Sequence, residues 1–105
     1  MKPILISEDD LTIQQKLSQI LPQHFGLTFE EVRSRSRKKD VSYARNLYCY
    51  FMRKRTIYSL EKIGEILNER DYSTIIGSVK AVKGMADVYP QVRDDIKQID
   101  QKLKG

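Results

Sequence analysis

The sequence predicts an all-α protein of about six helices, and three observations lead to that prediction. Apolar residues recur at spacings of three and four along nearly the whole chain, which is the period of a helix with one buried face. No stretch shows the sustained alternation of apolar and polar residues that is typical of strands. Because 40% of the 105 residues are apolar, they suffice for one core, and we expect a single domain over residues 1–105.

The first predicted helix opens with the acidic pair Asp9 and Asp10. It stops before Gly26, because glycine is typical of the position just after a helix end. Its apolar face is formed by Leu11, Ile13, Leu17, Ile20 and Leu21. We expect the preceding residues 1–8 to form a flexible N-terminal tail.

A short second helix is predicted to start after Thr28, which matches a capping box with Glu31. The stretch that follows has no apolar period and alternates arginine with serine, in the order Arg33, Ser34, Arg35, Ser36 and Arg37. We therefore expect a flexible basic loop between the second and third helices.

Four further helices are indicated by caps and apolar faces. Asp40, Ser59 and Asp71 are candidate N-caps of the third, fourth and fifth helices. A polar turn at residues 68–70 ends the fourth helix, and Pro90 favours a break before the sixth. The predicted core positions of these helices are Ala44, Leu47, Tyr48, Phe51, Met52, Leu60, Ile63, Ile66, Leu67, Ile75, Val79, Val82, Ala86, Val92, Ile96, Ile99 and Leu103.

The net charge of +5 is concentrated in one segment. Residues 33–56 contain nine Lys and Arg against one Asp, a formal charge of +8. Residues 1–32 carry −3, from two basic and five acidic residues, and residues 57–105 have eight of each sign. Such a segment is either a solvated face or the footprint of a polyanion such as a phosphate backbone.

The sequence lacks the signals that are typical of several functional classes. The chain has no GxxxxGK[ST] phosphate loop, no apolar stretch of membrane-spanning length and no secretory signal. His24 has no ligand partner at metal spacing, and Cys49 is expected to be a buried structural thiol. We therefore expect no enzyme, cofactor, metal site, membrane contact or small-molecule substrate, and a cytoplasmic location.

Two other groups of residues are assigned to structure rather than function. The first is a cluster of aromatic residues, formed by Tyr43, Tyr48, Tyr50, Phe51 and Tyr58. These rings could stack on single-stranded bases, but their helical spacing favours packing in and around the core. Gly77 and Gly84 lie inside the fifth helix, where each costs about 1 kcal/mol relative to Ala. We ascribe Gly77 to a close helix crossing, and nothing in the sequence explains Gly84.

The fourth and fifth predicted helices, joined by a short turn, have the pattern of a helix-turn-helix. The second of them begins with Asp71, Tyr72, Ser73 and Thr74. Free backbone N–H groups at a helix N-terminus favour a phosphate, and the methyl of Thr74 could pack on a thymine methyl. Asp71 could either cap its own helix or accept from a cytosine amino group.

Residues 63–79 resemble the signature of the C-terminal DNA-binding domain, domain IV, of the DnaA family of bacterial chromosomal replication initiators. That signature has an Ile-Gly pair, matched by Ile63 and Gly64, and then a basic residue, Asp, His, two hydroxyl residues and an apolar pair. The similarity covers roughly residues 11–104. It implies a Trp-repressor-like helix-turn-helix fold and sequence-specific binding of double-stranded DNA at DnaA-box-like sites.

The resemblance also assigns roles to residues of the basic segment. The family's minor-groove arginine falls on Arg37, beside Lys38, and its major-groove base-contacting arginine falls on Arg45. Guanidinium suits both tasks, because it fits a narrow minor groove and pairs bidentately with guanine. Asn46 stands where the family has Gln, and Arg53 stands where it has a backbone-contacting Lys.

At the start of the fifth helix, Asp71 matches the family's base-reading Asp, and Ser73 and Thr74 match its hydroxyl pair. Tyr72 stands where the family almost always has His. Tyrosine is longer and lacks the ring nitrogen, so the preferred DNA sequence is expected to differ from the family's box.

The resemblance leaves the biological role open. Family initiators carry an ATPase domain, which this sequence lacks, so the chain is expected to be a stand-alone, nucleoid-associated reader. It could compete with a full-length initiator for its sites, or regulate replication or transcription on a chromosomal or mobile element. The alternative is a protein-interaction module that has kept the fold and lost the DNA site.

Overall fold

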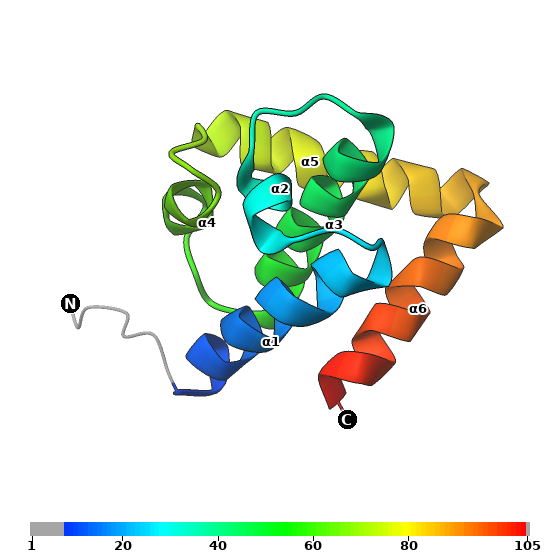
Figure 1. Ribbon diagram of the computed structural model, residues 1–105, viewed down its shortest axis with the longest axis horizontal. Coiled ribbons are helices and arrows are strands. Elements are labelled where there is room, and N and C mark those ends of the chain that lie inside the picture. The colour runs from blue at the N-terminus through cyan, green and yellow to red at the C-terminus, as the bar shows by residue number, and fades with distance from the viewer. Residues whose placement is uncertain (1–7, 105) are drawn as a thin grey trace.

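The computed structural model describes residues 8–104, which fold into six helices without strands (Figure 1). The all-α prediction is therefore confirmed for this part of the chain. The predicted flexible tail lies outside the described residues, except for Glu8, which is the first residue of α1. None of the described helices is long and apolar enough to span a membrane. The helices are α1 (Glu8–His24), α2 (Phe29–Arg33), α3 (Lys39–Arg55), α4 (Leu60–Ile66), α5 (Tyr72–Val88) and α6 (Pro90–Lys104).

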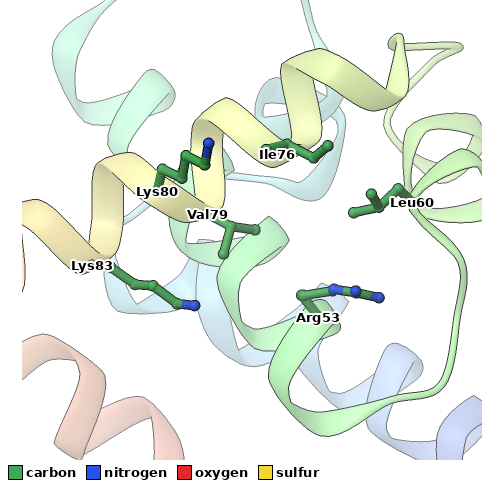
Figure 2. Close-up of a pocket in the computed structure, with 6 residues that line it drawn as sticks. All are labelled: Arg53, Leu60, Ile76, Val79, Lys80 and Lys83. Carbon is green, nitrogen blue, oxygen red and sulfur yellow. The ribbon is translucent and has the colours of Figure 1, made fainter.

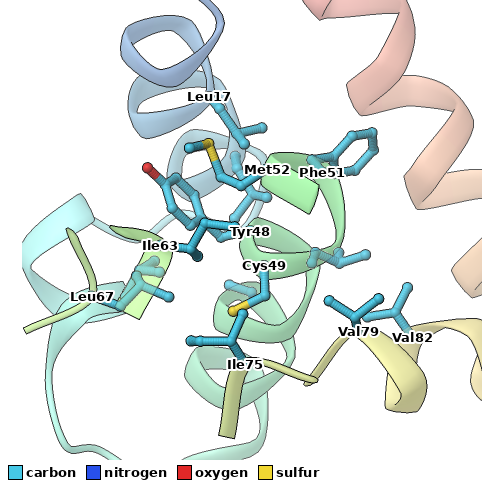
Figure 3. Close-up of a cluster of buried hydrophobic side chains, with 14 of the residues drawn as sticks. Leu17, Tyr48, Cys49, Phe51, Met52, Ile63, Leu67, Ile75, Val79 and Val82 are labelled. Carbon is cyan, nitrogen blue, oxygen red and sulfur yellow. The ribbon is translucent and has the colours of Figure 1, made fainter. Parts of the chain in front are cut away.

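Helix α3 is the central element, because it packs against α1, α2, α4 and α5. Its apolar residues lie in the core that Figure 3 shows, where Tyr48 and Phe51 are fully buried. Burying each large apolar side chain contributes roughly 1.5–3 kcal/mol to stability. Cys49 is buried, as predicted, and burial raises the pKa of its thiol to about 11, so it is not a reactive thiolate.

Three of the predicted helix boundaries are confirmed by their local contacts. Thr28 and Glu31 form a complete capping box at the start of α2. The Ser59 hydroxyl accepts the Lys62 N–H at 3.1 Å, which caps α4. Gly26, two residues after the end of α1, has φ +68°, a conformation that favours glycine.

The predicted N-cap of α3 is wrong, and the predicted N-cap of α5 is confirmed in position but lacks a side-chain cap hydrogen bond. Helix α3 begins at Lys39, and Asp40 lies inside its first turn, where its carboxylate accepts the N–H of Val41 at 2.8 Å. Asp71 occupies the N-cap position of α5, but its side chain accepts from no backbone N–H. It accepts instead from the Ser73 hydroxyl, at 2.8 Å.

The turn between α4 and α5 brings two backbone segments into close contact. Asn68 and Glu69 both have φ near +60°, which reverses the chain direction. The Arg70 N–H then donates to the Gly64 carbonyl at 2.9 Å. A Cβ on residue 64 would collide with the Arg70 carbonyl oxygen, so only glycine fits there.

Helix α6 is attached to the body through a buried carboxylate. Asp95, 6% exposed, accepts from the Tyr43 hydroxyl at 2.7 Å and lies 3.1 Å from His24 Nε2. Burial and this contact with Asp95 raise the pKa of Tyr43. His24 thus joins α1 to α6. Among the described residues no cluster of His, Cys, Asp and Glu could hold a metal ion.

We expect Gly64→Ala to lower the free energy of unfolding by about 3 kcal/mol, because the methyl group collides with backbone that cannot rotate away. Thermal or urea unfolding measures the change. The control is Glu65→Ala, at the exposed next position, which should change stability by less than about 0.5 kcal/mol. Equal stability of the two variants would contradict the close approach.

Candidate nucleic-acid interface

The N-terminal end of α5 presents an exposed polar surface. Asp71, Tyr72, Ser73 and Thr74 are all exposed, and half of the Tyr72 side chain is accessible. Because the Asp71 side chain at the N-cap accepts no backbone N–H, it leaves the N–H groups of the first turn unoccupied. These groups and the positive end of the helix dipole suit an anionic group.

Asp71 and Ser73 act as a pair. The 2.8 Å hydrogen bond from the Ser73 hydroxyl to Asp71 Oδ2 orients both side chains before any ligand arrives. The other oxygen of Asp71 is left as an acceptor, and the Ser73 oxygen keeps its lone pairs. The pair therefore offers acceptors beside the N–H groups of the helix end, a combination that can distinguish base edges.

The basic loop between α2 and α3 is irregular, as predicted, but its contacts argue against the expected flexibility. The Ser36 N–H donates to the Ser34 hydroxyl at 3.2 Å, and the Lys38 N–H donates to the Ser36 hydroxyl at 3.3 Å. Arg37 and Lys38 are exposed at its end. Arg37 makes no hydrogen bond or ion pair with any other described residue.

Arg45, to which the family resemblance assigns a base contact, is only 7% exposed. The basic loop covers it. Arg45 Nε donates to the Val32 carbonyl at 2.8 Å, and Nη2 donates to the carbonyls of Ser34 at 2.7 Å and Ser36 at 3.0 Å. Burial, and then the nearby charge of Arg70, lower the pKa of this guanidinium.

A second arginine binds the same oxygen. Arg70, in the turn before α5, donates from Nη2 to the Ser34 carbonyl at 2.6 Å. We call Arg45, Arg70 and the Ser34 carbonyl the arginine clamp. It joins α3, the basic loop and the helix-turn-helix turn at one point. Arg70 was not among the predicted site residues, although its place before Asp71 in the signature could have indicated it.

Two loop arginines strengthen this junction from the other side. Arg33 Nε donates to the Ile66 carbonyl at 2.8 Å, and Arg35 Nη2 donates to the Asn68 carbonyl at 3.3 Å. Both acceptors belong to the end of α4 and the turn after it. The loop is therefore held against the helix-turn-helix, and Arg37 extends from a fixed base.

The remaining predicted residues lie on α3. Asn46 is half-buried and Arg53 is exposed. They are seven positions apart, so they share one face of the helix. Arg53 lines a groove beside α5, with Leu60 and Ile76 across from it (Figure 2). The structure thus places Arg53 beside α5, whereas Arg37 and Lys38 lie on the loop.

The close helix crossing proposed for Gly77 is wrong. A Cβ at Gly77 would have no atom within 4 Å, and the same holds for Gly84. Both glycines are exposed on α5, so packing against a neighbouring helix explains neither of them.

A family model, the bacterial DnaA protein helix-turn-helix, matches residues 14–82, which is more than half of the chain. The chain belongs to this family. The match includes the basic loop, the arginine clamp and the start of α5, so it confirms the resemblance of residues 63–79 to the DnaA signature. It also confirms the predicted helix-turn-helix formed by α4 and α5.

Two DnaA proteins illustrate the relationship. The chromosomal replication initiator protein DnaA of Bacteroides fragilis is 32% identical over 85 residues, and that of Bacteroides thetaiotaomicron is 29% identical over the same length. Each match covers 81% of this chain and 18% of the relative. The chain therefore spans less than a fifth of the length of these DnaA proteins.

Because both glycines of α5 face open space, Gly77→Ala and Gly84→Ala should each raise the free energy of unfolding by up to about 1 kcal/mol. Ala81→Gly, at an exposed position of the same helix, should lower it by a similar amount. Urea titrations give the comparison. A loss of stability in Gly77→Ala would instead indicate a helix crossing.

Proposed function

We propose that this chain is a double-stranded DNA-binding domain that recognises DnaA-box-like sites, with α5 in the major groove and the basic loop in the minor groove. Membership of the DnaA helix-turn-helix family supports DNA binding in connection with replication initiation. The observation that carries the two-groove proposal is the arginine clamp. It holds the exposed Arg37 at a set position relative to the exposed start of α5.

Each exposed polar residue has a role in this proposal. Arg37 enters the minor groove, where its guanidinium fits the negative potential of a narrow A·T-rich stretch. Lys38 on the loop and Arg53 on α3 contact phosphates, and Asn46 shares a face of α3 with Arg53. At α5, Asp71, Ser73 and Thr74 read base edges.

We propose a different role for Arg45 from the one that the family resemblance implies. Bidentate pairing with guanine needs two adjacent donors of the guanidinium. Arg45 Nε and Nη2 are already bonded to three carbonyls, and the side chain is buried. Arg45 therefore positions the basic loop, and base recognition falls to Arg37 and to the start of α5.

Tyr72 stands where the family resemblance implies a histidine. Its ring is half exposed at the end of the reading helix. A phenol can donate to a phosphate or a base acceptor, but it reaches further than an imidazole. We propose that the preferred DNA sequence differs from the family's box at the bases next to Tyr72. By occupying such sites, the domain competes with a full-length initiator.

The direct test is selection of bound sequences from a random duplex pool, followed by affinities for the selected site and for random DNA. Arg37→Ala should lower the affinity for the selected site about tenfold or more, because one base contact contributes roughly 1–3 kcal/mol of discrimination. Arg53→Ala should weaken both duplexes alike and reduce the salt slope by about 1. An unchanged ratio of affinities in Arg37→Ala would refute the minor-groove role, and absence of any enriched sequence would refute site recognition.

The clamp is tested by a double-mutant cycle between Arg37 and Arg70. If Arg70 positions the loop, Arg37→Ala should cost much less affinity in an Arg70→Ala background, with a coupling energy of about 1 kcal/mol or more. Arg70→Lys keeps the charge, which separates a lost hydrogen bond from a lost attraction to DNA. Additive losses in the cycle would mean that the two arginines act independently.

A further inference from the structure

A groove with a basic rim runs along α5, on the side that faces α3 and the start of α4 (Figure 2). A second hollow adjoins it and shares Arg53, Val79 and Lys83 with it. The two form one continuous surface, which we call the basic groove; it is lined by Tyr50, Arg53, Lys54, Leu60, Ile76, Val79, Lys80 and Lys83.

The cations of the basic groove lack acidic partners. Arg53, Lys54, Lys80 and Lys83 are all exposed, and no acidic residue lines the groove. Within the described part of the chain none of the four forms an ion pair, whereas Arg33, Arg55, Lys62 and Lys104 each pair with a carboxylate. Four uncompensated like charges around one groove repel each other, and a polyanion relieves that repulsion.

The floor of the groove is apolar. Val79 is buried and Leu60 and Ile76 are half-buried beneath the cationic rim. A DNA strand presents deoxyribose carbons between successive phosphates. Its sugars can pack on this floor while its phosphates reach the rim, so the groove suits a sugar-phosphate backbone better than an isolated anion.

The far end of the groove lies beyond the bases that the start of α5 could read. Lys83 follows Tyr72 by eleven residues, a rise of roughly 16 Å along the helix at 1.5 Å per residue. That length equals about five base pairs of duplex at 3.4 Å each. Lys54 lines the second hollow together with Lys83.

We propose that the basic groove binds the backbone of DNA that flanks the recognised site, with Arg53 nearest the site and Lys54, Lys80 and Lys83 on the flanking phosphates. This inference rests on the proposed DNA binding and extends it. The domain then covers more duplex on one side of its site than on the other, and the additional contacts are independent of sequence.

The test compares three duplexes: one that ends at the selected site, one extended by about ten base pairs to the left and one extended to the right. The wild-type domain should bind one of the two extended duplexes more tightly and with a steeper salt dependence. In Lys54→Ala/Lys83→Ala this gain should disappear, and the salt slope on that duplex should fall by about 2.

The matched control is Lys16→Ala/Lys97→Ala, which removes the same charge from exposed positions on α1 and α6. It should retain the gain from the extended duplex. An equal effect of the two double variants, or the same affinity of the groove variant and the wild type for every duplex, would overturn the proposal. The latter result would point to an acidic protein as the occupant.

The same measurements separate this proposal from the one on which it rests. Binding of the short duplex that depends on Arg37, without any gain from either extension, leaves DNA recognition intact and refutes only the flanking contact. Failure to bind all three duplexes refutes the proposed function itself.

Discussion

The carbonyl oxygen of Ser34 accepts hydrogen bonds from two arginines, Arg45 at 2.7 Å and Arg70 at 2.6 Å. A carbonyl has two lone pairs, so both bonds can form together. The two positive charges repel each other, which contributes to the lowered pKa of Arg45. Hydrogen bonds from a charged donor contribute about 1.5–3 kcal/mol each, and the three bonds of Arg45 alone offset this repulsion. The position of the basic loop depends on this junction.

The clamp works because α3 and the turn before α5 are themselves held firmly. Helix α3 is supported by the core around Tyr48 and Phe51, so Arg45 starts from a rigid backbone. The turn contains two residues in the left-handed region, Asn68 and Glu69, a strain of about 1 kcal/mol or more each. The bond from the Arg70 N–H to the Gly64 carbonyl offsets part of this strain and fixes the direction in which the Arg70 side chain leaves the turn.

Local signals predicted the helices well, because caps and apolar periods act within a few residues. The capping box of Thr28 and Glu31 is an example. The burial of Arg45 could not be predicted because its environment is non-local: periodicity cannot tell that a loop eleven residues earlier covers this side of α3. Gly77 shows another limit, since a glycine in a helix looks the same in sequence whether it meets a neighbour or open space. The partner of the Asp71 side chain could not be predicted, because the Ser73 hydroxyl and the backbone N–H groups of the first turn are donors equally close to it in sequence.

The net charge of a segment does not show which of its charged side chains bond within the fold and which remain exposed. Three of the nine cations in residues 33–56 are engaged in hydrogen bonds to carbonyls within the fold: Arg33, Arg35 and Arg45. Residues 57–105 are neutral in sum, yet they contribute Lys80 and Lys83 to the basic groove. Four of their eight carboxylates line a separate hollow around the turn, together with Arg70 and Tyr72: those of Glu61, Glu65, Glu69 and Asp71. A phosphate backbone is attracted along the groove and repelled by Glu61, Glu65 and Glu69, whereas a base edge that donates to Asp71 carries no charge to be repelled.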